Sequence, residues 1–309
     1  MTKSGSENIE IAVKSISEYV NVILEKKRKL EPEGDIWFRG QGSMTFKLRP
    51  NLYRKILDGG DKKKTIIRNT NLIKRLEGNI DMSFSRKAFS FFSKRSIPDT
   101  PWYRYFLKQH YKLHTRLLDW TESALIALFF ALEDQTIKED AQVLILSPSK
   151  LNNYSINKLL DTKKNFHLIP SCSNLPKKGE MFTSQGLLSF EQLLRKYYWL
   201  DCDEDEKMFP IAMYPPHLDE RMSAQQACFT LFGNVIDGLN TDNSKEIIID
   251  YVQIDAGSKG KMLKDLKALG INYYSIYPDL DGLGKSINEE FIEEFENAKL
   301  WDSFENFFS

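Results

Sequence analysis

The sequence predicts an α+β fold: a single mixed domain with a split or curved, mainly antiparallel sheet, a buried central helix and an N-terminal helical section. Three observations predict it. Short strand-type segments alternate irregularly with helical ones along the 309 residues. The run from Ala124 to Leu132 is apolar on every side, as in a helix buried all round. An amphipathic helical pattern opens the chain.

The first third of the chain is predicted to be mainly helical. Residues 8–29 place apolar side chains three and four apart, which predicts an amphipathic helix. The stretch "IWF" then predicts a short strand with Arg39 and Gly40 at its end. Residues 46–54 are predicted to be extended, because Pro50 disfavours helix at the residue before it. Two further helices are predicted over residues 65–92 and 102–112.

The remaining chain is predicted to supply most of the sheet. The stretch "AQVLIL" at 141–146 is strand-like, and residues 150–208 show no decisive pattern. Strands are predicted at "PIAMY", "ACFTLF" and "EIIIDYVQI", followed by the helix "SKGKMLKDLKAL" with Gly270 in a C-cap position. A last strand, "INYYSIYP", and a closing helix complete the expected order.

The charge balance and the hydropathy restrict the class of protein. Lys plus Arg equals Asp plus Glu, at 43 each, so the formal net charge is zero. The overall charge therefore does not favour binding to nucleic acid or to a membrane surface. The longest apolar run is nine residues, against the roughly 20 that a membrane-spanning helix needs. The polar start lacks a signal-peptide core, and the three cysteines show no metal spacing. We therefore expect a reduced, cytoplasmic protein without membrane contact.

The stretch "QHYKLHTRLLDW" at 109–120 concentrates polar chemistry just before the apolar run. Asp119 either caps the helix that follows or belongs to a functional site. Arg116 either forms an ion pair with Asp119 or binds a phosphate group through two hydrogen bonds of its guanidinium. His110 and His114 are four residues apart, but no H-E-x-x-H pattern accompanies them, so we expect hydrogen-bonded histidines and no metal. The start of a buried helix also attracts anions.

Several motifs together resemble the FRG domain family, which is named after a Phe-Arg-Gly motif, here residues 38–40. They are "WFRGQ", "LRPNLYR", the stretch from 109 to 132, and "RMSAQQACFTLF" at 221–232. The resemblance covers roughly residues 35–286. It implies an FRG domain over 35–286, and the helical patterns on either side predict an N-terminal helix within 1–34 and a C-terminal helix over 287–309 that packs on the same domain. The family's usual Gly-Leu-Pro is replaced by residues 112–114, and its usual glycine by Ala227.

A second resemblance is to ADP-ribosyltransferases of the Arg type. It implies NAD as the substrate, with Arg39 on the phosphates, Asp119 facing the positive charge that develops on the ribose, and Gln225 near a ribose hydroxyl. The glutamate that those enzymes carry before an apolar strand is absent before "ACFTLF". The further residues expected to bind the ligand are Gly40, Gln41, Gln109, His110, Thr115, Arg116, Trp120, Thr121 and Arg221.

Three functions fit these residues. One is an NAD-dependent ADP-ribosyltransferase or NAD glycohydrolase with a protein or nucleic-acid acceptor. Another is a non-catalytic module that senses a nucleotide-type small molecule or a nucleic acid. A plain nucleic-acid surface would instead interleave Arg39, Arg49, Arg54 and Arg68 with the aromatic residues Trp37, Phe46 and Tyr53. The resemblance to the FRG family implies a role in bacterial defence or as a toxin.

Overall fold

The computed structural model describes residues 12–31, 34–58, 66–67, 69–95, 100–163, 169, 180–183, 186–239 and 249–297. The strands of the main sheet are β1 (Trp37–Gln41), β2 (Leu117–Thr121), β3 (Ala141–Leu146), β6 (Ile211–Met213), β7 (Ala227–Leu231) and β8 (Ile249–Ile254). The larger helices are α1 (Ile16–Leu30), α2 (Asn51–Asp58), α3 (Asn71–Arg95), α4 (Pro101–His110), α5 (Ala124–Leu132), α6 (Pro148–Leu160), α7 (Phe190–Trp199), α9 (Lys259–Ala268) and α11 (Leu280–Asn297). The smaller elements are α8 (Glu220–Ala224), α10 (Tyr273–Ile276), the turn η2 (Ala256–Ser258) and a hairpin of β4 (Glu180–Thr183) with β5 (Gly186–Ser189).

The main sheet is antiparallel and open, with the strand order β6-β7-β2-β1-β3-β8. Five residue pairs join β2 to β7, and five join β1 to β3. By contrast, β1 and β2 share one pair, Phe38 opposite Thr121. The sheet therefore consists of two well-paired halves that separate beyond this point, which agrees with the predicted α+β fold and split antiparallel sheet.

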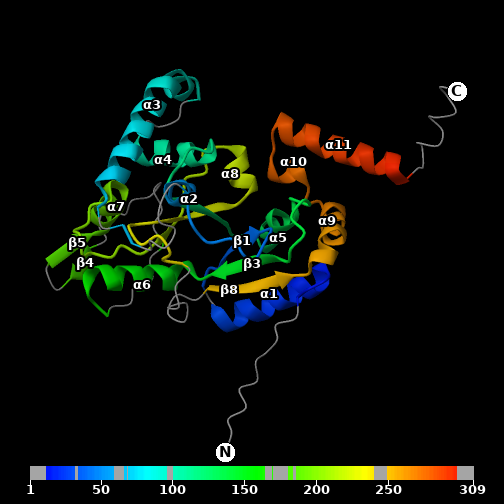
Figure 1. Cartoon of the computed structure of the whole chain (residues 1–309), viewed down its shortest axis with the longest axis horizontal. Helices are drawn as coiled ribbons and strands as arrows, with labels where there is room; N and C mark the ends of the chain where they lie inside the picture. The colour runs from blue at the N-terminus through cyan, green and yellow to red at the C-terminus, as the bar shows by residue number, and fades with distance from the viewer. Residues whose placement is uncertain are drawn as a thin grey trace, which may run out of the picture.

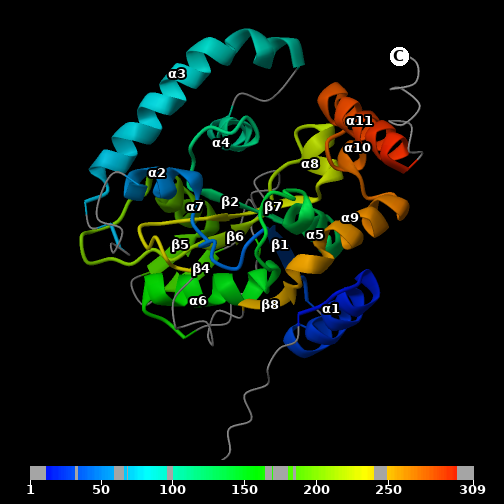
Figure 2. The same ribbon diagram turned by 45° about the vertical axis from the view of Figure 1, so that its right-hand side comes forward.

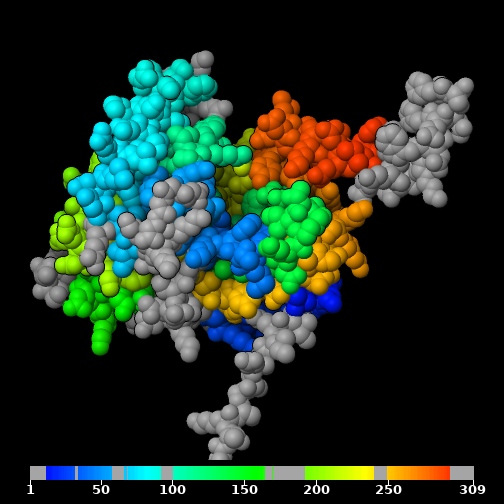
Figure 3. Space-filling view, viewed as in Figure 1, coloured from blue at the N-terminus to red at the C-terminus, as the bar shows by residue number. Residues whose placement is uncertain are grey.

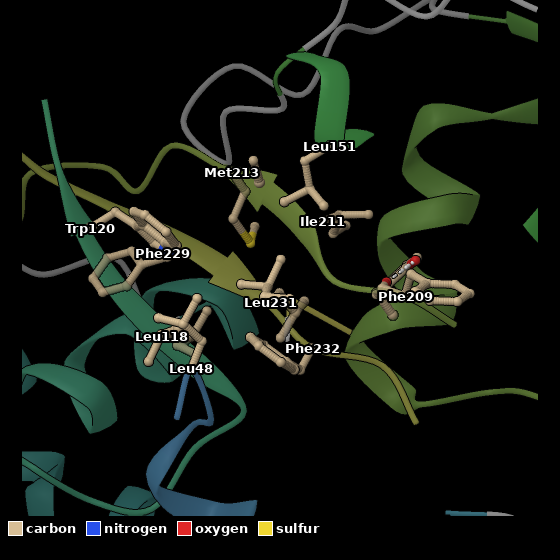
Figure 4. Packing of buried hydrophobic residues seen from close by; sticks show 14 of the residues in the cluster. Leu48, Leu118, Trp120, Leu151, Phe209, Ile211, Met213, Phe229, Leu231 and Phe232 are labelled. Atoms are coloured by element: carbon tan, nitrogen blue, oxygen red, sulfur yellow. Dashed lines mark hydrogen bonds between the residues drawn. The ribbon is translucent and has the colours of Figure 1, made fainter. Parts of the chain in front are cut away.

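Helices cover both faces of the sheet (Figures 1 and 2). Trp37 belongs to one apolar core and its neighbour Phe38 to the other, as strand alternation requires. The first core packs β2, β6 and β7 against α2, α4, α6 and α7, and Figure 4 shows Trp120, Phe229 and Phe232 within it. The second core packs β1, β3 and β8 against α1, α5 and α9.

The predicted central helix is confirmed as α5. Six of its nine residues are buried, and Leu128 is fully buried. Its N-cap is Ser123, whose hydroxyl accepts a hydrogen bond from the Ile126 amide at 3.4 Å. The interpretation of Asp119 as the cap is therefore wrong, since Asp119 lies within β2 and faces outward. The turn after β2 supplies the cap instead.

Two segments differ from the sequence prediction. The region around Pro50 was predicted to be extended, but α2 begins at Asn51, because the proline restricts only the residue before it and suits a helix start. The stretch "INYYSIYP" was predicted as a strand but contains the one-turn helix α10. There Asn272 and Ser275 form a reciprocal capping box, a local set of hydrogen bonds that outweighs the β-propensity of the tyrosines and isoleucines.

Other boundaries shift by a few residues. The first helix begins at Ile16, while Val13 forms a bridge with Ile254, and residues 1–11 lie outside the described chain. The long helix α3 begins at Asn71. The predicted C-terminal helix begins at Leu280, and residues 298–309 lie outside the described part. The domain boundaries at 34 and 286 stay predictions. None of the helices in the described ranges has the length and apolarity that crossing a membrane requires.

Candidate functional site

A cleft opens where β1 and β2 separate. Its first hollow has a volume of about 330 Å³, within the usual range for small-molecule sites. β1, β2 and β7 form its floor, while the end of α4, the segment 221–225 and the end of α5 form its walls. The strand end at Arg39, the loop at 109–121 and the segment 221–226, which carry most of the expected site residues, therefore each contribute side chains to one cleft.

Arg39 lies at the gap between the two halves of the sheet. Its Nη1 donates a hydrogen bond to the backbone carbonyl of Asp119 on β2. Its Nε is buried and has no hydrogen-bond partner among the described residues. Burial lowers the pKa of Arg39 to about 10, and the nearby charge of Asp119 only partly opposes this shift. The guanidinium thus keeps an unsatisfied donor beside the cleft.

A chain of hydrogen bonds holds the Asp119 carboxylate. Nε2 of Gln109 donates to both carboxylate oxygens, at 2.9 and 3.0 Å. The Oε1 of the same amide accepts a hydrogen bond from the buried Thr115 hydroxyl, which fixes the amide orientation. Thr115 therefore orients the Gln109 side chain from the buried side and does not line the hollow. Asp119 itself lines the first hollow.

The opposite wall comes from α8 and its surroundings. Gln225 lines the first hollow, and its Nε2 donates to the carbonyl of Ile276 at 3.3 Å. The Thr121 hydroxyl donates to the Gln225 carbonyl at 2.7 Å, which ties this segment to β2. The Arg221 guanidinium lies 4.6 Å from the centre of the Tyr277 ring. These contacts join the segment 221–225 to both the sheet and α10.

His110 lies at the rim of the first hollow, at the end of α4. Its Nε2 is 3.2 Å from a carboxylate oxygen of Asp219, the N-cap residue of α8. This contact joins the two walls of the hollow across its mouth. His114, four residues further on, is exposed in the loop beyond the helix and does not line the hollow. Because α4 ends at His110, the two histidines do not share a helical face despite their four-residue spacing.

Gly40, Gln41 and Trp120 have clear structural reasons for their identity. A Cβ on Gly40 would lie 1.9 Å from the Ala127 carbonyl oxygen, so only glycine lets α5 pack directly on β1. Gln41 is buried, and its Oε1 accepts from Gln142 at 2.9 Å. Trp120 is buried in the floor of the first hollow, and its Nε1 donates to the Thr230 hydroxyl at 3.1 Å.

Arg116 is a correction to the predicted ligand-binding set. Its side chain is fully buried, and its Nε donates to both carboxylate oxygens of Glu77, at 3.0 and 2.9 Å. Its two other nitrogens donate to the carbonyls of Tyr197, Phe232 and Tyr198 at 2.8–3.0 Å. These bonds occupy the guanidinium inside the protein, so Arg116 joins α3, α7 and the residue that follows β7, and it lines neither hollow of the cleft. The alternative ion pair with Asp119 is also wrong.

Glu133 is a cleft residue that the sequence analysis missed. It follows α5 directly and lines both hollows of the cleft. The Tyr277 hydroxyl donates to its Oε2 at 3.3 Å, and the Tyr273 hydroxyl donates to its backbone carbonyl at 3.3 Å. Burial raises the pKa of the Glu133 carboxyl, which the hydrogen bond from Tyr277 opposes. No motif marks this glutamate, because the tyrosines that hold it lie 140 residues or more further along the chain.

A second hollow of about 720 Å³ adjoins the first. The two share Arg39, Gly40, Phe130 and Glu133. One wall of the second hollow is the segment between β1 and the end of α2, and the other is the turn that follows α5. On the face shown in Figure 3 these two segments, blue and green, lie side by side.

One known protein family matches part of the chain. The model of the FRG domain matches residues 34–140. The chain carries an FRG domain. Among curated proteins and among solved structures, no match to the chain is found. The matched part of the FRG domain supplies Arg39, Gln109, Asp119 and Glu133 to the cleft, whereas Gln225 comes from outside the matched range.

Proposed function

We propose that the cleft of this FRG-domain protein binds a phosphate-bearing ligand of nucleotide type through Arg39. The observation that carries the proposal is the buried Nε of Arg39, which has no partner among the described residues. An unsatisfied buried donor costs about 1–3 kcal/mol, and more when it is charged. A phosphate oxygen would satisfy it with a charge-assisted hydrogen bond, for which the arginine fork is well suited.

A second arginine strengthens the preference for an anion. Arg54 on α2 lies near enough to Arg39 for its charge to lower the pKa of Arg39 further. Partial burial lowers the pKa of Arg54 as well, and the charge of Asp119 opposes both shifts. An anion bound at Arg39 would reduce the repulsion between these two cations at the edge of the cleft.

We propose NAD as the ligand, in line with the resemblance to ADP-ribosyltransferases. Cleavage of the nicotinamide–ribose bond leaves positive charge on the ribose, as in glycoside hydrolysis. The apolar floor with Phe38, Trp120 and Phe229 suits a flat ring. Asp119 and Glu133 are the carboxyl groups at hand for the ribose, and Gln225 would bind a hydroxyl of the same sugar. The reaction would be an NAD glycohydrolase or ADP-ribosyl transfer.

A second candidate is a non-catalytic module that senses a nucleotide. It is favoured by the hydrogen bonds that Gln109 donates to both oxygens of Asp119. Both oxygens of this carboxylate already accept hydrogen bonds before a ligand arrives, which leaves fewer acceptor positions free to act on a ribose and so favours recognition. In both cases we propose a cytoplasmic protein with a role in bacterial defence or as a toxin, as the family resemblance implies.

The test combines binding with product release. Purified protein is incubated with NAD while nicotinamide is followed, and the melting temperature is recorded with and without ADP-ribose. We expect a ligand-induced rise in melting temperature that Arg39→Ala abolishes, because binding weakens by about 1.5–3 kcal/mol. Arg28→Ala is the control, since Arg28 is exposed on α1 and lies in neither hollow.

The outcomes separate the two candidates. Nicotinamide release that Arg39→Ala removes supports the enzyme. Binding of ADP-ribose without release supports the sensing module. If neither NAD nor ADP-ribose shifts the melting temperature of the wild-type protein, or if Arg28→Ala weakens binding as much as Arg39→Ala, the nucleotide-binding proposal is wrong.

A further inference from the structure

The second hollow is lined in part by cations that have no ion pair within the described chain. Of its cations, Arg49 is paired with Asp237 through two contacts of 2.6 Å, and both side chains are 11% exposed. Arg54 donates its Nε to the carbonyl of Arg49 at 2.7 Å, but no carboxylate in the described chain lies within ion-pair distance of it. Lys47 is exposed and likewise has no ion pair within those ranges. Arg54 and Lys47 therefore present their charge to the hollow.

The two walls of this hollow differ in chemistry. Lys47 and Arg54 lie on the wall from the segment after β1, whereas Glu133 and Asp134 lie on the turn that follows α5. A ligand that fits both walls needs an anionic group at one end and hydrogen-bond donors, such as sugar hydroxyls, facing the other. A phosphorylated sugar meets both requirements.

An exposed aromatic ring adds the third feature. Phe46 lines the hollow and is 49% exposed. The other aromatic residues that the sequence suggested for a nucleic-acid surface, Trp37 and Tyr53, are fully buried and cannot stack on a base. The other ring in the lining, Phe130, is only partly exposed and lies at the border with the first hollow, so Phe46 offers a stacking surface for one base and not for a tract of single strand.

We propose that the second hollow binds one phosphorylated nucleotide, either free or at the end of an oligonucleotide, as a ligand separate from the one in the first hollow. Arg54 and Lys47 hold its phosphate, and its base stacks on Phe46. The shared border at Arg39, Gly40, Phe130 and Glu133 brings the two ligands next to each other. The inference rests on the proposed function only for the identity of the neighbouring ligand, and it makes the second hollow the subsite of an acceptor.

The first experiment measures the binding of AMP by titration calorimetry. We expect Arg54→Ala to weaken AMP binding about tenfold or more, since a charge-assisted hydrogen bond is lost. Lys55→Ala is the matched control, because Lys55 is the exposed neighbour of Arg54 on α2 but lines neither hollow. It removes the same charge and is expected to change the affinity by less than about twofold, given screening by salt.

Two further comparisons identify the chemistry. Phe46→Ala is expected to weaken AMP binding about fivefold or more, the scale of a lost base–aromatic stack. Adenosine, which lacks the phosphate, is expected to bind more weakly than AMP and to be insensitive to Arg54→Ala. A 5′-phosphorylated trinucleotide distinguishes the sources: tighter binding than AMP indicates a nucleic-acid end, and equal or weaker binding indicates a free nucleotide. Lys47→Ala replaces Arg54→Ala if that variant does not fold.

The decisive arm repeats the AMP titration with ADP-ribose at saturation. Binding of AMP that persists and keeps its dependence on Arg54 supports two separate ligands. Mutual exclusion, with both ligands weakened by Arg54→Ala, shows that one ligand spans both hollows and overturns the proposal. Absence of AMP binding, or AMP binding that neither Arg54→Ala nor Phe46→Ala weakens, overturns it too. If ADP-ribose fails to bind while AMP binds as expected, the proposed function is wrong and the second site stands.

Discussion

Two arginines at neighbouring strands of the sheet have opposite environments. Arg116, just before β2, has hydrogen bonds from its Nε and both terminal nitrogens to Glu77 and to three backbone carbonyls, and it is fully buried. Arg39, on β1, has one hydrogen bond to a backbone carbonyl and a buried Nε without a partner in the described chain. A satisfied arginine stabilises the fold, whereas an unsatisfied one at a cleft is available to a ligand.

The pKa values of the two guanidinium groups reflect the same difference. The carboxylate of Glu77 raises the pKa of Arg116, despite the opposing effect of burial. Burial without such a partner lowers the pKa of Arg39 to about 10. The fold therefore favours the charged form of Arg116 and disfavours the charged form of Arg39. A bound anion would stabilise the charged form of Arg39 and raise its pKa again. The free energy of this stabilisation would contribute to the affinity for the ligand.

The largest expected effect is that of Arg116→Ala. Removing Arg116 leaves the Glu77 carboxylate without its cation, although the Tyr105 hydroxyl still donates to it, and takes a donor from three backbone carbonyls. We therefore expect the free energy of unfolding to fall by about 3–5 kcal/mol. Chemical denaturation of the variant and of Arg39→Ala, side by side, measures the difference. If Arg39→Ala loses as much unfolding free energy as Arg116→Ala, the distinction between a structural Arg116 and a ligand-binding Arg39 is wrong.

Gly40→Ala tests the scaffold that presents Arg39. The added Cβ would lie 1.9 Å from the Ala127 carbonyl oxygen and 2.6 Å from the Ala131 amide nitrogen, so β1 and α5 must move apart. We expect a loss of about 1–3 kcal/mol or more in unfolding free energy, the range for overpacked sites. Gly78→Ala on α3 is the control: nothing lies within 4 Å of its added Cβ, and we expect a gain of about 0.5–1 kcal/mol. Equal effects of the two substitutions would contradict this account.

Arg39→Lys sharpens the comparison at smaller scale. Stability should change by less than about 0.5 kcal/mol, because the fold depends on Arg39 for one hydrogen bond only. Binding of ADP-ribose should stay weaker than in the wild type by about 1 kcal/mol or more, since an ammonium cannot form the planar fork. Calorimetry and thermal melts give both values. Full recovery of affinity by lysine would indicate that only charge is recognised.

The smallest expected effect is a pH dependence from Glu133. The folded protein raises the pKa of this carboxyl above its ordinary value of 4.5, so it binds a proton more tightly than the unfolded chain does. The resulting stabilisation is complete below the unfolded pKa and is lost as the pH rises through the folded pKa. Relative to the wild type, Glu133→Gln should therefore gain stability as the pH rises from about 4 to 8.

Denaturation curves at several pH values test this, with Glu122→Gln as the control. Glu122 is an exposed carboxyl in the turn after β2 and lines neither hollow. The substitution removes the same charge at an exposed position outside the cleft, and the comparison is between the pH slopes of the two variants. A Glu133→Gln variant whose stability runs parallel to that of the wild type would show that Glu133 is solvated like a surface carboxyl.

Local sequence patterns predicted the structure correctly for segments whose own residues determine it. The apolar run of α5 predicts a buried helix because it leaves no polar face for solvent. The order of motifs predicts the FRG domain, and their polar residues predict the segments that meet at the cleft. The same reasoning failed for Asp119 and for α10. A nearby serine competes for the cap of α5 in the first case, and a capping box competes with strand formation in the second.

What the sequence by itself determined is thus the α+β class, the buried helix and the set of polar segments around it. Only the tertiary structure decided which polar residue serves the fold and which faces the cleft. The reason is that the deciding partners are distant in the chain: Glu77 lies 39 residues from Arg116, and Tyr277 lies 144 residues from Glu133. Burial and hydrogen bonding of a side chain depend on these distant neighbours, which no local pattern contains.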